Sequence, residues 1–163
     1  MKVIFLDIDG VLNTTRTKNP RKLPYVVEKP LVRRFKALAR KTRARVVLIS
    51  TWRYDPAGLF SARHHGIPFH DRTPDLPHQP RRDEIMAWLK AHPQVARYAV
   101  IDDDDDDLDG LPLFQPNPRE GLTASLAHAV AHFLAGKRTK DRRRSAPVRM
   151  VRRAINALRR HPG

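Results

Sequence analysis

Cysteine is absent from the sequence, which excludes disulfide bridges and zinc sites built on thiolates. Long apolar runs are absent as well, and no segment is long enough to cross a membrane as a helix. The apolar run at residues 3–6 begins so early in the chain that we expect no secretory signal peptide. A cytoplasmic location is therefore the default expectation.

Acidic residues are few compared with basic ones. The sequence contains 17 Asp and Glu and 32 Lys and Arg, which gives a formal net charge of +15. Residues 137–163 contain 11 of the basic residues and a single acid, Asp141, so they carry +10, while residues 1–136 carry +5. We therefore expect one domain over 1–136 and a basic tail over 137–163. Such a tail suits a polyanion, either nucleic acid or an acidic membrane surface, although a tail that only increases solubility fits the composition equally well.

Short apolar runs alternate with helical patterns along the 163 residues, a length that suits one domain with a real core. Uninterrupted apolar runs are typical of strands buried on both faces of a parallel sheet, and they occur at 3–6, 45–49 and 98–101. The spacing of apolar residues predicts helices over 28–41, 59–65, 83–91 and 124–135, with minor strands over 67–69 and 111–114 and a further helical stripe within 146–160. Strand, helix and strand in this order predict right-handed crossovers and a doubly wound, Rossmann-like α/β sheet.

Polar side chains follow each of the three predicted central strands. They are Asp7 and Asp9, then Ser50 and Arg53, then Asp102 and Asp103. The carboxyl ends of parallel strands meet at one edge of a sheet, which is also where such sheets bind ligands. Carboxylate oxygens without cysteine or a histidine pair suit a hard cation, Mg²⁺ foremost, and Mg²⁺ together with arginines is an environment that handles phosphate. In such a site one aspartate can attack phosphorus, and a second carboxyl can protonate the leaving oxygen and then activate water.

The motifs at these strand ends resemble those of the haloacid dehalogenase (HAD) superfamily of phosphotransferases. Residues 7–11, Asp-Ile-Asp-Gly-Val, look like its first motif, DxDG(T/V). By this resemblance Asp7 is the nucleophile, and Asp9 is the general acid and base whose backbone carbonyl also ligates Mg²⁺. Ser50 corresponds to the second motif, which binds the phosphoryl group. Asp102 and Asp103 correspond to the acidic fourth motif, with Asp103 favoured as the direct metal ligand.

The third motif of the superfamily supplies a lysine, and this sequence has arginines at the matching place. Arg81 and Arg82 both precede the predicted helix over 83–91, and the sequence does not decide which of them faces the phosphate. Arginine keeps its charge more firmly than lysine but presents a different, forked geometry. The resemblance also implies that Gly10, Thr51 and Arg53 contact the substrate.

A narrower resemblance covers residues 2–135. The succession FLDIDGVLN, ISTWR, RRDEIMAWL, VIDDDDD and GLT is similar to the small HAD domains associated with RNA repair proteins and to the phosphatase part of polynucleotide kinase-phosphatases. Neither the segment after Gly10 nor the segment over 53–81 is long enough for a full cap domain. The resemblance thus implies an open site, which the nearby Arg16, Lys18, Arg21 and Lys22 make suitable for a polynucleotide end or a phosphoprotein.

Several of these residues also fit a purely structural role. Ser50 and Thr51 are suited to capping a helix, and Arg53 to pairing with the aspartates instead of binding phosphate. Trp52 and Trp88 are predicted in the core, and residues 104–107 in a solvated loop. The histidines at 64, 65, 70 and 78 are expected in loops without a metal.

Three functions from different classes follow from the sequence. The leading hypothesis is an Mg²⁺-dependent phosphatase that acts on terminal phosphates of RNA or DNA. The second is a nucleic-acid-binding module on a HAD scaffold with little or no activity. The third is a membrane-surface or assembly role for the segment 146–160.

Overall fold

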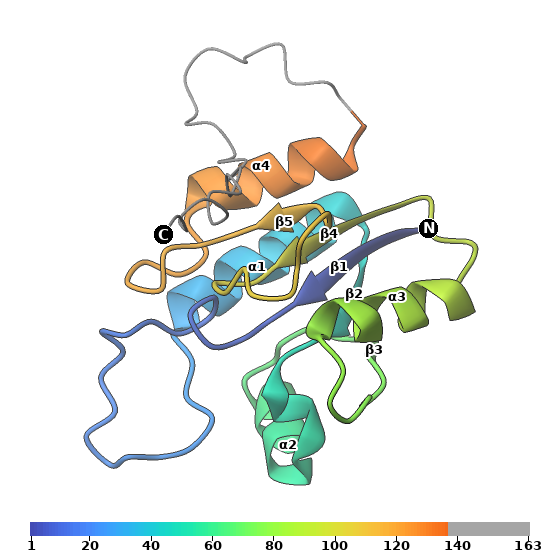
Figure 1. Ribbon diagram of the computed structural model, residues 1–163. Coiled ribbons are helices and arrows are strands. Elements are labelled where there is room, and N and C mark those ends of the chain that lie inside the picture. Colours follow the sequence, from blue (N-terminus) through green and yellow to red (C-terminus); the bar gives the residue numbers. More distant parts are fainter. Residues whose placement is uncertain (137–163) are drawn as a thin grey trace, which may run out of the picture.

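A five-stranded sheet forms the centre of the molecule, and all its strands run parallel in the order β3-β2-β1-β4-β5 (Figure 1). The computed structural model describes residues 1–136, so the predicted helix within 146–160 lies outside the described residues. The strands are β1 (Lys2–Leu6), β2 (Arg45–Leu48), β3 (Asp71–Arg72), β4 (Arg97–Ile101) and β5 (Leu113–Phe114). The doubly wound α/β sheet expected from the sequence is therefore confirmed.

The three central strands end level with one another. Leu6, the last residue of β1, pairs with Leu48 of β2 on one side and with Ile101 of β4 on the other. The residues that follow the strands consequently leave the sheet side by side. This register brings the polar residues after β1, β2 and β4 to a single edge.

Helices cover the two faces of the sheet unequally (Figure 1). Helices α1 (Lys29–Thr42) and α4 (Ala124–Leu134) pack together on one face, where Phe35 and Val130 join the core formed by alternate strand residues such as Ile4. On the opposite face α3 (Arg81–Ala91) packs Ile85 and Trp88 against the other strand residues. Each strand contributes to both cores because its successive side chains point to opposite faces of the sheet.

Local sequence signals explain where several helices begin. The Thr123 hydroxyl accepts a hydrogen bond of 3.2 Å from the Leu126 N–H and caps α4, as the sequence predicts. The Asp55 carboxylate accepts one of 2.8 Å from the Ala57 N–H, so α2 (Pro56–His64) begins three residues before the expected position 59. Helix α3 begins at Arg81, two residues before the expected 83, directly after Pro80.

The prediction of a minor strand over 67–69 was wrong in position. The strand β3 forms at 71–72, and its pairing is extended by bonds of 2.9 Å from the His70 N–H to the Val46 carbonyl and 3.0 Å from the Thr73 N–H to the Leu48 carbonyl. Ile67 is apolar because it is buried in the core, and Pro68 has no N–H to donate to a ladder. Apolar character therefore indicates burial here but not strand pairing.

The connections at the carboxyl edge contain no domain-sized insertion. Residues 7–28 form a loop, and between β2 and α3 lie only the 3₁₀ turn η1 (Thr51–Tyr54), α2, β3 and loops. Within residues 1–136 neither connection builds a cap domain, so the edge stays open. Among the helices of the same residues, none combines the length and the apolar content needed to span a bilayer.

Candidate active site

Three carboxylates gather where β1 and β4 end. Asp7, Asp102 and Asp103 each place one oxygen within 4.8 Å of the others. The Asp7 backbone N–H donates a 2.9 Å hydrogen bond to the Ile101 carbonyl, which continues the pairing of β1 with β4 by one residue. Asp7 and Asp102 are buried and Asp103 is half-buried. The predicted acidic clusters thus meet at one point.

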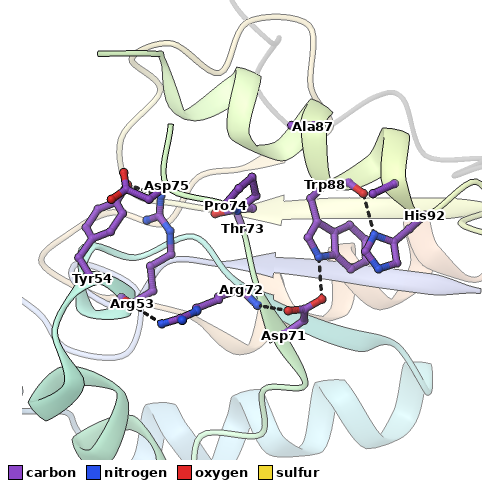
Figure 2. Close-up of a pocket in the computed structure, with 11 residues that line it drawn as sticks. Arg53, Tyr54, Asp71, Arg72, Thr73, Pro74, Asp75, Ala87, Trp88 and His92 are labelled. Carbon is purple, nitrogen blue, oxygen red and sulfur yellow. Dashed lines mark hydrogen bonds between the residues drawn. The ribbon is translucent and has the colours of Figure 1, made fainter. Parts of the chain in front are cut away.

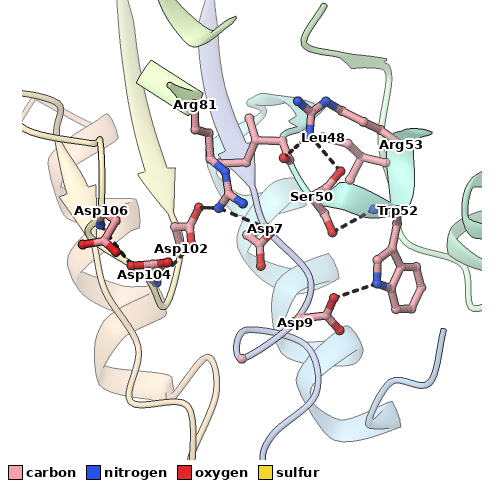
Figure 3. Close-up of polar contacts among 12 residues, drawn as sticks. Asp7, Asp9, Leu48, Ser50, Trp52, Arg53, Arg81, Asp102, Asp104 and Asp106 are labelled. Carbon is pink, nitrogen blue, oxygen red and sulfur yellow. Dashed lines mark hydrogen bonds and ion pairs between the residues drawn. The ribbon is translucent and has the colours of Figure 1, made fainter. Parts of the chain in front are cut away.

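Arg81 is the cation that lies among these carboxylates (Figure 3). Its guanidinium forms an ion pair and hydrogen bond with Asp102, and Nη1 lies 3.9 Å from Oδ1 of Asp7. Arg82 is exposed, and its charge acts on Tyr98, whose pKa it lowers against the larger effect of burial. Of the two arginines that the sequence offered, the structure therefore places Arg81 at the aspartates.

Negative charge exceeds what Arg81 alone balances. Burial raises the pKa of Asp7 well above its usual range, the charge of Asp102 raises it further, and Arg81 opposes the rise. Burial is also the largest cause that raises the pKa of Asp102 and of Asp103. Ionised carboxylates this close together are unfavourable without a further cation. A donor set of oxygens only, with this surplus of charge, fits Mg²⁺.

Gly10 allows Asp103 to approach the end of β1. The Gly10 backbone has φ +68°, and a Cβ at this position would collide with the Asp103 carboxylate. Any other residue would both strain the turn and displace that carboxylate. The DxDG turn is therefore matched to the acidic residues after β4.

Asp9 lies at the solvent-exposed side of the same turn, and two donors fix its carboxylate. Trp52 Nε1 donates a 2.9 Å hydrogen bond to Oδ2, and Asn13 Nδ2 donates one of 2.7 Å to Oδ1. Asn13 Oδ1 also accepts a 2.9 Å bond from the Gly10 N–H. Sequence reasoning predicted Trp52 only as a core residue, and it is buried, but its indole N–H also serves the site. The signal was available, because a buried Trp N–H usually finds a partner.

Ser50 and Thr51 follow β2 at the same edge. Ser50 is fully buried, and its hydroxyl accepts a 3.4 Å bond from the Trp52 N–H at the start of η1. Thr51 is exposed and lines a cavity of about 260 Å³ together with Arg81 and Asp104. The capping role that the sequence suggested for Ser50 thus exists. Figure 3 shows the residue at the same edge of the sheet as Asp7.

Arg53 is buried and engaged by its own surroundings. Its guanidinium forms an ion pair with Glu84 of α3 and donates a 3.0 Å hydrogen bond to the Ser50 carbonyl. The partner of Arg53 is therefore Glu84 and not an aspartate of the cluster. Sequence reasoning missed Glu84, because nothing local marks which residue of α3 faces the end of β2.

The other acidic residues and the histidines lie outside this cluster. Residues 104–107 are all exposed. The Asp104 N–H donates a 3.1 Å hydrogen bond to Oδ1 of Asp102, and the Asp106 N–H donates one of 3.0 Å to Oδ1 of Asp104. The carboxylates of Asp104, Asp105 and Asp106 approach within 4.8 Å of one another, as exposed acidic loops commonly do. Among residues 1–136, no histidine belongs to a group that could hold a metal.

The buried pair of Arg53 and Glu84 generates a stability prediction. We expect Glu84→Ala to lower the free energy of unfolding by about 3–5 kcal/mol, because it leaves the Arg53 charge buried without its partner. The double variant Arg53→Met with Glu84→Leu should recover much of this loss. Urea denaturation measures both, and Asp83→Ala on the same turn is the matched control. A loss for Glu84→Ala no larger than that of the control would contradict the arrangement.

The raised pKa of Asp7 leads to a second stability prediction. A carboxyl whose folded-state pKa is raised stabilises the folded state fully only below its unfolded pKa of about 3.9, and this contribution is lost as pH rises through the folded value. In EDTA at pH 7 we therefore expect Asp7→Asn to melt at a higher temperature than the unmodified protein, with a difference that shrinks toward about pH 4. Thermal denaturation across this range tests the sign, and the exposed Asp109→Asn is the control. An Asp7→Asn protein that melts lower at pH 7 would refute it.

Comparison with known proteins agrees with this geometry. A family model described as the HAD domain in Swiss Army Knife RNA repair proteins matches residues 3–127, more than three quarters of the chain. Comparisons with curated proteins and with solved structures find no match. HAD domains are in general hydrolases such as phosphatases and generally use Mg²⁺. The chain belongs to the HAD superfamily, in the family of domains found in Swiss Army Knife RNA repair proteins.

Proposed function

We propose that the chain is a Mg²⁺-dependent phosphatase that removes terminal phosphates from RNA or DNA through an aspartyl-phosphate on Asp7. The observation that supports this most directly is the placement of Asp7. It is a buried carboxylate at the carboxyl edge of the sheet, with Arg81 and two further aspartates around it. This arrangement supplies a nucleophile and the means to hold a phosphoryl group beside it.

Two displacements at phosphorus make up the proposed reaction. An Asp7 carboxylate oxygen attacks phosphorus, the bond from phosphorus to the ester oxygen breaks, and Asp9 gives its proton to that leaving oxygen. Asp9 then takes a proton from water, which attacks phosphorus and releases inorganic phosphate and free Asp7. The hydrogen bonds from Trp52 and Asn13 hold the Asp9 carboxylate for both transfers. Arg81 and the Ser50 hydroxyl orient the phosphoryl group.

The residues that would hold Mg²⁺ are Asp7, Asp103 and the Asp9 backbone carbonyl, with Asp102 beside them. Bound there, the ion would neutralise charge on the phosphoryl oxygens and the clustered carboxylates. Asp102 is the partner of Arg81, so its main contribution is to fix that guanidinium. Arg53 is assigned a positioning role, since Glu84 and backbone carbonyls already engage it.

A nucleic-acid end is the substrate class that the surroundings favour. The family occurs in RNA repair proteins, and the edge is open. The loop after the DxDG turn contains no acid between Gly10 and Val27, and its exposed basic side chains are Arg16, Lys18, Arg21 and Lys22. A 2.9 Å hydrogen bond from the Thr15 N–H to the Pro118 carbonyl brings this loop next to the exposed Arg119. Such a surface suits successive backbone phosphates.

A nucleic-acid-binding module with little activity is the second candidate. The same basic loop and the basic composition of residues 137–163 favour it. The two candidates differ in what Asp7 does, because binding alone needs no nucleophile.

Replacement of Asp7 separates these functions. We expect Asp7→Asn to abolish phosphate release from p-nitrophenyl phosphate and from a 3′-phosphorylated oligonucleotide, because the amide cannot attack phosphorus. EDTA should abolish release by the unmodified protein, and excess Mg²⁺ should restore it. Inorganic phosphate is measured in each case, with Asp109→Asn as the control. Retained turnover in Asp7→Asn would exclude the mechanism, and absence of turnover in the unmodified protein with salt-sensitive oligonucleotide binding would favour the binding module.

The hydrogen bond from Trp52 to Asp9 yields a separate prediction. A hydrogen bond to a charged group contributes about 1.5–3 kcal/mol, so Trp52→Phe should lower kcat by roughly 10- to 100-fold. Trp88→Phe, whose indole N–H is bound to Asp71, serves as the control with p-nitrophenyl phosphate. A kcat for Trp52→Phe equal to that of the Trp88→Phe control would show that Trp52 only fills space.

A further inference from the structure

A groove runs beside α3 on the face of the sheet opposite to α1 and α4 (Figure 2). Within residues 1–136, α3 is the one helix packed on that face, so the surface next to β3 is left uncovered. The resulting hollow has a volume of about 600 Å³, within the range typical of small-molecule sites. We call it the α3 groove, and its lining includes Tyr54, Asp71, Arg72, Asp75, Trp88 and His92.

The α3 groove adjoins the cavity beside the candidate active site. Arg53 and Tyr54 line the groove and also the smaller cavity that contains Arg81. Arg81 in turn lies 3.9 Å from the Asp7 carboxylate. Figure 2 shows Tyr54 at one end of the groove and Trp88 at the other, with the β3 residues between them. A molecule whose phosphate lies at Asp7 can therefore extend past Arg81 and Tyr54 into the groove.

An exposed aromatic ring lies at one end of the groove. Tyr54 is 48% exposed, and its hydroxyl is held by a 2.9 Å hydrogen bond to Glu84. At the far end Trp88 is buried, and the His92 ring stacks on it with centroids 3.7 Å apart. An exposed aromatic ring whose position is fixed by hydrogen bonding is a suitable platform for a nucleobase.

Positive charge does not dominate the groove. Glu84 pairs with the buried Arg53, which leaves the Arg72 guanidinium beside the carboxylates of Asp71 and Asp75. The groove therefore suits a neutral ligand whose edges carry both donors and acceptors. It differs from the loop over 14–24, whose charges are all positive and suit phosphates.

We propose that the α3 groove binds the base of the nucleoside that carries the terminal phosphate. The proposal rests on the phosphatase function above, and it assigns the substrate's base to the groove and its backbone phosphates to the basic loop. Base stacking tolerates any sequence because every base has an aromatic face. The site thus favours nucleic-acid ends over small phosphate esters without reading their sequence.

Filling the groove tests this assignment. Ala87→Phe places a bulky ring in the groove without touching Asp7, Asp9 or Arg81, and Ala91→Phe does so at an exposed residue. The matched control is Ala129→Phe on the exposed side of α4. KM and kcat are measured with a 3′-phosphorylated adenine dinucleotide and with p-nitrophenyl phosphate, whose ring directly adjoins the phosphate. Binding of the unphosphorylated dinucleotide is followed separately through quenching of tryptophan fluorescence, to which Trp88 in the groove and Trp52 at Asp9 both contribute.

We expect both groove variants to raise the dinucleotide KM by about 10-fold or more and to weaken quenching equally. KM and kcat for p-nitrophenyl phosphate should not change in these variants, and Ala129→Phe should match the unmodified protein with both substrates. The assignment would be overturned if the dinucleotide KM did not change in the groove variants, or if the dinucleotide did not quench the fluorescence of the unmodified protein. It would also be overturned if the groove variants raised KM for a phosphotyrosine peptide but not for the dinucleotide. If the unmodified protein releases no phosphate, the proposed function fails, and quenching that both variants weaken still supports the groove.

Discussion

Repulsion between buried carboxylates at the level ends of β1 and β4 is the constraint on which the rest of this structure depends. The pairing of Leu6 with Ile101 brings Asp7 and Asp102 out of the sheet together, and the Gly10 turn lets Asp103 join them. Burial penalises this charge and raises the pKa of all three carboxyls. The Arg81 guanidinium, which lies near Asp7 and pairs with Asp102, offsets part of this penalty. A site that retains negative charge after its own cation is in place is suited to recruit a metal ion.

Two ion pairs of opposite polarity fix α3 to the edge of the sheet. Arg81 in its first turn reaches Asp102 after β4, and Glu84 one turn further reaches Arg53 after β2. The helix is thereby held across both strand ends, and Arg81 is oriented toward Asp7. The same placement leaves the surface along β3 open and creates the α3 groove. A buried pair of this kind contributes little net stability, so its value lies in the position it imposes.

The sequence predicted most of the fold because apolar runs and helical spacing are local signals. The strands at 45–49 and 98–101 and the helix at 28–41 correspond to β2, β4 and α1 within one residue at each boundary. The prediction that the acidic residues meet followed from parallel topology alone. The partners of Trp52 and Arg53 were not predictable, because Asp9 and Glu84 are distant in sequence and only packing brings them near. Arg81 and Arg82 were indistinguishable, since neighbours on a helix point about 100° apart and the phase was unknown.

The two aspartates of the DxDG turn lie in surroundings that suit the two different roles proposed for them. Strand β1 carries Asp7 into the buried edge, where its neighbours are other carboxylates and Arg81. Two residues later Asp9 has left the sheet and is exposed, and its neighbours are the neutral donors of Trp52 and Asn13. A nucleophile needs a fixed position beside cations, whereas a group that exchanges protons with water needs access to it. The period of the strand and the turn that ends it therefore separate the two roles, and the open edge above Asp9 is the same opening through which a nucleic-acid end would enter.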